Sequence, residues 1–229
     1  MKRIGILGGA SPESTIEYYR RITREVTRRF GDFGYPEILI YSVTFQRFVE
    51  WMHAGDWCAL ATGVARGIET LAAAGAEVGL IATNTFHKVY DEVAAFSPIP
   101  LVSILDVVAD RLETLGCRRA ALLGTRITMS SAFYPNRLSR SGVTTVVPTD
   151  AEQRAIERVI FEELTRGRIV PESKAALVAI ASRLVQEGAD AVILGCTELP
   201  LLLGQDGFSV PVLDTTTLHA DAALEAALA

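Results

Sequence analysis

The chain has 229 residues, of which 49% are hydrophobic and 21% charged, and its formal net charge is −5. This length and composition are typical of a folded enzyme with one large or two small domains. The negative balance and the lack of a basic stripe argue against nucleic acid as a partner. No apolar run reaches the length of a membrane span, and no signal peptide is evident, so we expect no membrane partner. Three cysteines without C-x-x-C spacing predict free thiols in a reducing cytoplasm.

Short apolar segments alternate with amphipathic helical patterns from one end of the chain to the other. In the first half we expect strands at 3–8, 36–43 and 78–82, and helices at 12–30, 57–73 and near 86–95. The first helix is expected to bury a stripe made of Ile16, Tyr19, Ile22, Val26 and Phe30. Its expected end is the glycine that follows, at position 31.

The second half repeats this alternation after a proline-rich linker at Ser97–Pro100. The expected strands are 119–123, 143–147, 190–195 and 210–213, and the expected helices are 104–115, 129–140, 151–166, 172–187 and 215–228. Strands that alternate with helices are typical of parallel sheets covered on both faces. The sequence therefore predicts the α/β class with doubly wound sheets.

The two halves share a repeated strand and turn. Gly75–Asn84 aligns without a gap with Gly188–Thr197, and Lys2–Gly9 aligns with Arg118–Thr125. The first alignment makes Thr83 and Cys196 equivalent positions. The repeat predicts two similar half-sites that hold one small molecule between opposed side chains, which suits chemistry on both faces of one carbon atom.

Four polar turns follow expected strands, at 8–11, 83–85, 124–126 and 196–198. Any one of them alone is more often a simple tight turn, but four turns in two matched pairs favour one shared site beyond the carboxyl ends of the strands. Gly9, Ala10 and Ser11 lead into a helix, with Ser11 as its N-cap and Pro12 as its first residue. Such an N-terminus favours a small carboxylate, because the nucleotide pattern G-x-G-x-x-G is absent.

Several side chains near these turns are candidates for catalysis. Cys196 at the start of an expected helix is predicted to be a thiolate base, and the alternative is a small buried residue. The hydroxyl of Thr83 is far less acidic, so its expected roles are to donate a hydrogen bond, hold water or relay a proton. His87 orients a group or supports the site from behind. Arg47 and Arg126 either bind a carboxylate or are solvated. No ligand spacing for a metal is present.

The segments that carry these residues resemble the aspartate/glutamate racemase family. They are Ile4–Arg20, Thr83–His87, Leu123–Thr125 and Leu194–Pro200. The resemblance implies a cofactor-independent amino-acid racemase that forms a homodimer. It also implies two α/β domains related by a pseudo-twofold, with the active site in the cleft between them. The last strand and helix return to the first domain, so we expect residues 1–98 plus 208–229 in one domain and 99–207 in the other.

In that family two cysteines flank the α-carbon of the substrate. The resemblance places the second cysteine at Cys196 and the first position at Thr83, as in a subgroup with one thiol. It further implies substrate contacts from Asn84, Thr85, Thr125, Thr197 and Glu198. With the turn residues and the segment after the second strand, the expected binding set also includes Gly9, Ala10, Ser11, Gln46 and Arg47. Ala10 stands where many members have methionine.

The leading hypothesis is therefore racemisation of a small, acidic amino acid, with Cys196 as base on one face and Thr83 on the other. A second hypothesis is decarboxylation or cis–trans isomerisation of a small dicarboxylate by the single cysteine. A third is a small-acid-binding protein that has lost catalysis.

Overall fold

The computed structural model describes all 229 residues, and the chain forms two compact units. Unit 1 comprises Met1–Ile104 and Thr216–Ala229, and unit 2 comprises Leu105–Thr215. The chain thus leaves unit 1 once and returns for its last helix. None of the helices is both long and apolar enough to cross a membrane.

Unit 1 is built on four parallel strands in the order β2-β1-β3-β4. The strands are β1 (Ile4–Gly8), β2 (Ile38–Ser42), β3 (Val78–Ile81) and β4 (Leu101–Val102). The helices are α1 (Pro12–Phe30), α2 (Phe45–Ala54), α3 (Trp57–Ala73), the 3₁₀ helix η1 (Thr85–Val89), α4 (Tyr90–Ala94) and α10 (Thr215–Leu228).

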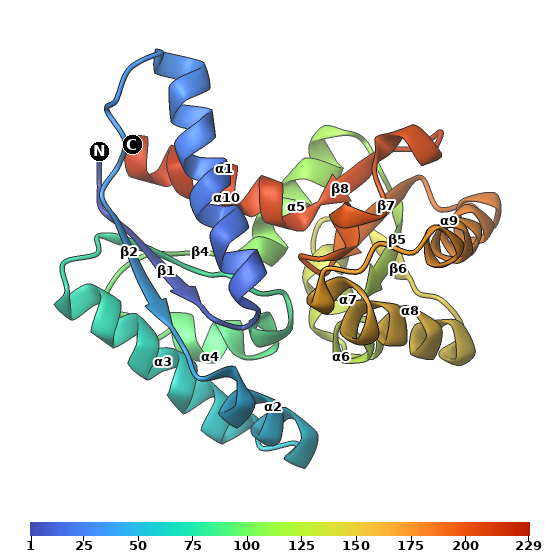
Figure 1. Ribbon diagram of the computed structural model, residues 1–229, viewed down its shortest axis with the longest axis horizontal. Coiled ribbons are helices and arrows are strands. Elements are labelled where there is room, and N and C mark those ends of the chain that lie inside the picture. Colours follow the sequence, from blue (N-terminus) through green and yellow to red (C-terminus); the bar gives the residue numbers. More distant parts are fainter. The chain divides into compact units, whose positions relative to one another are not determined.

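Helices cover both faces of the unit 1 sheet. On one face Ile4 and Ile6 pack with apolar residues of α1 and α10, and on the other Leu7 and Ile81 pack with α3 and its neighbours. Figure 1 shows α1 beside α10, with α3 across the sheet from them. The sheet is therefore doubly wound, and β2 is its open edge.

The buried face of α1 differs from the expected stripe. Tyr18, Ile22 and Val26 are buried, whereas Ile16, Tyr19 and Phe30 are about half exposed. The expected stripe is wrong at both of its ends because positions 18, 22 and 26 share a helical face and the sheet packs against that face. Apolar side chains therefore remain on the outer surface of α1.

Unit 2 is also built on four parallel strands, in the order β6-β5-β7-β8. Its first strand along the chain, β5, therefore lies between the second and third, as β1 does in unit 1. The strands are β5 (Arg119–Gly124), β6 (Thr144–Val146), β7 (Ala191–Gly195) and β8 (Val212–Asp214). The helices are α5 (Ile104–Thr114), α6 (Arg126–Ser130), α7 (Phe133–Ser139), α8 (Asp150–Glu162), η2 (Leu164–Arg166), α9 (Pro171–Gln186), η3 (Leu199–Leu201) and η4 (Gln205–Gly207). Leu123 and Leu194 lie in a core shared with α8 and α9. The predicted fold class, with two similar doubly wound parallel sheets, is confirmed.

The units end at different residues from those expected. β4 pairs with β3, so the chain up to Ile104 belongs to unit 1 rather than ending at residue 98. β8 pairs with β7, so the last strand completes the sheet of unit 2, and the expectation that it returns to the first domain is wrong. Strand pairing thus places β4 in unit 1 and β8 in unit 2, and only α10 returns to unit 1.

Candidate active site

Each sheet has a topological switch point, where the connections from two neighbouring strands leave in opposite directions. In unit 1 this is the carboxyl end of β1 and β3, and in unit 2 that of β5 and β7. Open parallel sheets bind ligands at such points. Leu7 pairs with Ile81, and Leu123 pairs with Leu194. Thr83 and Cys196 each follow their strand residue by two positions, so they occupy equivalent places in the two units.

The glycine turn after β1 depends on the absence of side chains. A Cβ atom on Gly8 would come within 2.5 Å of the Thr15 side chain, and one on Gly9 within 2.6 Å of the backbone nitrogen of Val43. Gly9 also has a φ of 88°, which suits glycine. Its N–H donates to Thr15 Oγ1 at 2.9 Å. The first turn of α1 and the end of β2 therefore fix the turn from both sides.

Ser11 holds the N-terminus of α1 at a backbone angle that is rare for a residue with a side chain. Its φ is 99°, the only positive value outside glycine. Its Oγ accepts a hydrogen bond from the Ser14 N–H at 3.4 Å, which caps the helix as predicted. Such strain is concentrated at functional sites. The positive end of this 19-residue helix therefore lies beside the turn, where a carboxylate would be stabilised.

Two residues that build this turn were not among the expected site residues. Ser14 Oγ donates to the Ser11 carbonyl at 2.9 Å and to the Ala82 carbonyl at 3.3 Å, so it ties the turn after β1 to the end of β3. Thr15 donates to the Ser11 carbonyl at 3.2 Å. Their hydroxyl side chains, three and four positions after the N-cap, are the sequence feature that could have identified them.

Thr83 is half-buried and is held at both of its backbone polar groups. Its N–H donates to the Ile81 carbonyl at 2.8 Å, and its carbonyl lies 2.8 Å from His87 Nδ1. Asn84 is buried and Thr85 is half-buried, and they lead into a 3₁₀ helix rather than an α-helix. The expected residues of this turn therefore lie together at one strand end.

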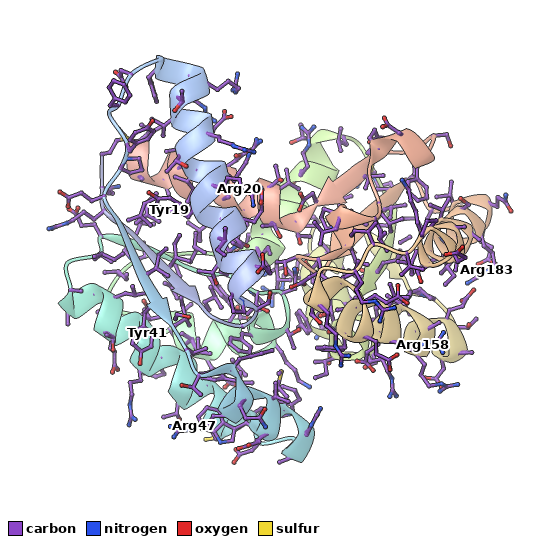
Figure 2. The ribbon with its side chains drawn as sticks, in the orientation of Figure 1. Tyr19, Arg20, Tyr41, Arg47, Arg158 and Arg183 are labelled. Carbon is purple, nitrogen blue, oxygen red and sulfur yellow. The ribbon has the colours of Figure 1, made fainter.

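Gln46 and Arg47 lie on α2, a helix that the sequence pattern did not reveal. Both are exposed, and Gln46 donates to Glu50 on the same helix at 3.0 Å. Figure 2 shows Arg47 on α2, beyond the end of β2. The Val43 N–H donates to the Gly8 carbonyl at 3.0 Å, which connects only the chain before α2 to the glycine turn.

In unit 2 the turn after β5 is capped by Thr125. Its Oγ1 accepts from the Thr128 N–H at 3.3 Å, so the side chain starts α6, and it is half-buried. Arg126 is exposed, and its backbone N–H donates to Glu157 at 3.1 Å. Thr125 follows Gly124, which pairs with Gly195 immediately before Cys196.

Cys196 is buried, with 7% of its surface exposed, and its thiol donates to Glu198 Oε2 at 3.0 Å. Burial, and then the charge of Glu198, raise the pKa of the Cys196 thiol well above its usual value, although the backbone N–H groups of Glu198 and Leu199 favour the thiolate. The helix that follows is a 3₁₀ helix of only three residues, so its small dipole gives the thiolate little stabilisation. The raised pKa therefore favours the thiol over the expected thiolate in this state.

Glu198 is 5% exposed and has one oxygen engaged and one unused. Oε2 accepts from the thiol of Cys196 and, at 2.7 Å, from the hydroxyl of Thr197. Oε1 is buried without a hydrogen-bond partner. A buried carboxylate oxygen without a donor costs free energy, so this side chain is suited to take up a proton or a ligand N–H group.

The other cysteines are placed differently. Cys58 is exposed on α3, and Cys117 is buried, with its sulfur 3.6 Å from the Asp190 carbonyl. Burial, followed by the charge of Asp190, raises the pKa of the Cys117 thiol. Neither lies at the carboxyl end of a strand, so both serve as matched controls for Cys196.

These features define an α/β enzyme with a repeated switch point, a thiol paired with a carboxylate in one unit and a hydroxyl in the other. A family model described as Asp/Glu/Hydantoin racemase matches residues 7–223. The chain belongs to this family and is an amino-acid racemase.

Individual relatives agree with this assignment. A crystal structure of a candidate Asp/Glu racemase from Yersinia pestis is 40% identical, covers 100% of both chains and superposes with a TM-score of 0.93. That of an aspartate racemase homologue from Pyrococcus horikoshii OT3 is 38% identical, again over 100% of both chains, with a TM-score of 0.88. The broad specificity amino-acid racemase RacX of Bacillus subtilis (strain 168) is 24% identical over 99% of this chain and 98% of its own length.

Proposed function

We propose that this racemase acts on a small acidic amino acid, aspartate or glutamate, without a cofactor. Cys196 exchanges the α-proton on one face of the substrate, and Thr83 serves the other face. The observation that carries the proposal is the matched register that gives Thr83 and Cys196 the same place in two equivalent sheets. Racemisation needs a proton donor or acceptor on each face of one carbon atom, and two equivalent half-sites provide that pair.

Glu198 is the group that makes the Cys196 thiol reactive. A thiol is a poor base, and the proton must leave before the sulfur can attack the α-hydrogen. The hydrogen bond from Sγ to Oε2 gives the proton a direct path to the carboxylate. When the ammonium group of a substrate approaches, its charge favours the thiolate, and the unused oxygen of Glu198 is an acceptor for its N–H bonds.

On the other face the hydroxyl of Thr83 cannot act as a thiolate does. We propose that it donates a hydrogen bond to the carbanion face or holds the water that delivers the proton. The α-proton of an amino acid is only weakly acidic, so the carbanion that forms when it leaves needs stabilisation at the substrate carboxylate. The turn Gly9–Ser11 at the start of α1 is proposed for this role, with the hydroxyls of Thr125 from unit 2 and Thr85 from unit 1 and the side-chain amide of Asn84 as further donors. Thr197, whose hydroxyl donates to Glu198, is proposed as a neighbouring substrate contact.

The single thiol makes the two faces unequal. Two enantiomers have equal free energies in water, so kcat/KM must be equal in the two directions. The difference between the two faces must therefore appear in another rate, that of α-proton exchange with solvent in which the amino acid keeps its configuration. Cys196 returns a solvent-derived proton to the face from which it took one, whereas Thr83 has no comparable route.

Heavy-water exchange over a panel of D- and L-amino acids tests this proposal. The expected result is deuterium at the α-carbon of aspartate or glutamate, with one enantiomer exchanging faster than it inverts. Cys196→Ala should abolish exchange, and the matched Cys58→Ala should not change it. Exchange that survives Cys196→Ala would refute the assignment of the base.

The rival chemistries give different products in the same samples. Carbon dioxide from a substituted malonate would support a decarboxylase, and interconversion of cis and trans dicarboxylates would support an isomerase of that class. Ligand-dependent stabilisation without turnover of any of these compounds would support a binding protein.

We also propose that the chain forms a homodimer through one face of unit 1. This edge face consists of Ile16, Tyr19, Tyr35, Ile38 and Ile40. Tyr19 and Ile40 are 49% and 45% exposed, and a hollow of about 420 Å³ lies among Tyr19, Tyr35 and Ile38. β2 is an open edge strand without a charge or proline, which natural proteins avoid unless the edge is covered. Figure 2 shows Tyr19 and Tyr41 on α1 and β2.

A second copy fits this face because charge is distributed unevenly along α1. Glu13 and Glu17 lie in its first two turns, and Arg20 and Arg24 follow nearer its C-terminus. An antiparallel copy places acidic residues opposite basic ones, as a two-fold interface requires. Sedimentation velocity should show a dimer that Ile40→Lys dissociates and that Phe161→Lys, at an equally exposed position on α8, leaves intact. A monomer at micromolar concentration would refute the proposal.

A further inference from the structure

Two buried histidines hold the segment through which the chain leaves unit 1. His87 on η1 is 2% exposed and His219 on α10 is 0% exposed, and their rings meet edge to face with centroids 5.6 Å apart. His87 bonds to the backbone of Ile104, and His219 bonds to the backbone of Val102. The two rings thus bond to the last residue of β4 and the first residue of α5, on either side of Ser103.

The hydrogen bonds assign the proton on each ring. The N–H of Ile104 donates to His87 Nε2 at 3.1 Å, so Nε2 carries a lone pair. His87 Nδ1 therefore carries the proton and donates it to the Thr83 carbonyl at 2.8 Å. His219 Nε2 must donate to the Val102 carbonyl at 2.9 Å, which leaves Nδ1 to accept from the Tyr18 hydroxyl at 2.8 Å. Both rings are neutral in this arrangement.

His87 thereby connects two backbone groups that have no other regular partner. Ile104 is the first residue of α5, and the first N–H groups of a helix have no partner within it. Thr83 lies beyond the end of β3, outside the sheet. One imidazole satisfies both groups and sets the distance between them. His219 and Tyr18 fix the same segment from the side of α1 and α10.

We infer that His87 is a positioning residue that holds Thr83 for its face of the reaction. The inference rests on the proposed function of Thr83. The ring has no direct role in proton transfer, because both of its nitrogens are engaged by backbone. A displacement of a reacting group by about 1 Å can lower a rate on the order of 100-fold. Loss of the contact between the ring and the Thr83 carbonyl should therefore slow inversion while the partial reaction at Cys196 continues.

Two variants separate the contacts of the ring. Asparagine places an amide nitrogen near the position of Nδ1, so His87→Asn keeps a donor for the Thr83 carbonyl and loses the acceptor for Ile104. Glutamine extends an amide oxygen toward the position of Nε2, so His87→Gln keeps the Ile104 contact and loses the Thr83 contact. His53, which is exposed on α2, provides the matched control His53→Gln.

Inversion and configuration-retaining exchange are measured in heavy water for the full chain. We expect His87→Gln to slow inversion on the order of 100-fold, with exchange at the Cys196 face nearly unchanged. His87→Asn should recover most of the inversion rate, and His53→Gln should match the unaltered chain. Equal losses of inversion in both His87 variants, or a parallel loss of exchange and inversion, would indicate a merely structural role and overturn the inference.

A readout without turnover distinguishes failure of this inference from failure of the proposed function. Nitrogen-15 NMR of the histidine rings reports the tautomer, and amide exchange reports the protection of Ile104. We expect the Nδ1–H tautomer at His87, with Ile104 protected in His87→Gln and exposed to exchange in His87→Asn. An active chain with the Nε2–H tautomer would overturn the positioning role alone, and an inactive chain with the Nδ1–H tautomer would overturn the proposed function.

Discussion

Acid should lower the free energy of unfolding of unit 1, because the ring of His219 is buried and neutral in the folded chain. Burial lowers the pKa of His219 from 6.5 to about 4, although the Val102 carbonyl opposes this shift. The groups that face the ring are the Tyr18 hydroxyl, the His87 ring and that carbonyl. Between pH 6.5 and 4 the unfolded chain binds a proton at this position and the folded chain does not. Stability is therefore lost as the pH falls through this range.

This lowering of the pKa of His219 corresponds to roughly 3 kcal/mol once the pH is below both pKa values. Between pH 7.5 and 4.5 linkage gives a loss of about 2–3 kcal/mol from this group alone. His219→Gln removes the titration but keeps an amide donor for the Val102 carbonyl. It removes the Nδ1 acceptor that His219 offers to the Tyr18 hydroxyl, which should cost about 1–3 kcal/mol at pH 7.5. The difference between the two proteins should therefore shrink as the pH falls.

Urea unfolding followed by tryptophan fluorescence measures this effect in the right part of the molecule. Both tryptophans of the chain, Trp51 and Trp57, belong to unit 1. Free energies of unfolding are compared at several pH values between 7.5 and 4.5, with His53→Gln as control, because carboxylates contribute equally to all three proteins. If His219→Gln showed the same pH dependence as the unaltered chain, the neutral buried ring inferred from the hydrogen bonds would be refuted.

Three further changes have defined outcomes. Glu198→Gln removes the proton acceptor of Cys196, so exchange at pH 7 should fall by about 10²–10⁴-fold and recover partly at higher pH, as measured in heavy water. Glu25→Gln should destabilise unit 1 by about 1–2 kcal/mol at pH 7 in urea unfolding. Hydrogen bonds from Arg28 and Arg29 lower the pKa of Glu25 from 4.5 to about 2, and solvent around the exposed Arg28 screens part of this interaction. This stability is present above pH 4.5 and is lost toward pH 2, so a difference that stayed constant with pH would contradict the prediction. Gly9→Ala should slow exchange on the order of 100-fold by displacing the turn from Val43, whereas Gly31→Ala, with a similar positive φ and open space, should only destabilise.

The sequence predicted the parts of the fold that depend on local pattern. The helices at 12–30 and 57–73 have the predicted bounds, because their caps and apolar spacing are complete within the segment. The equivalence of Thr83 and Cys196 was also readable, since repeated strands keep their register. Helix α2 was missed because its apolar residues pack on α3 only after folding. The assignment of β8 was wrong because strand pairing is a tertiary choice.

Within the candidate site, residue types were predictable and protonation states were not. The resemblance placed Glu198 among the substrate contacts, but only the folded chain shows its carboxylate 3.0 Å from the Cys196 sulfur. The high pKa of that thiol follows from burial, which the spacing of residues does not encode. His87 was expected to support the site, yet its partner Ile104 lies 17 residues away and could not be chosen from sequence.

The central claim is that residues 83 and 196 serve opposite faces of one carbon atom, and Thr83→Cys tests it most directly. The ratio of configuration-retaining exchange for the two enantiomers is measured in heavy water before and after this change. A second thiol at the equivalent position should bring a strongly uneven ratio toward equality. A ratio that stays as uneven as in the unaltered chain would contradict the claim.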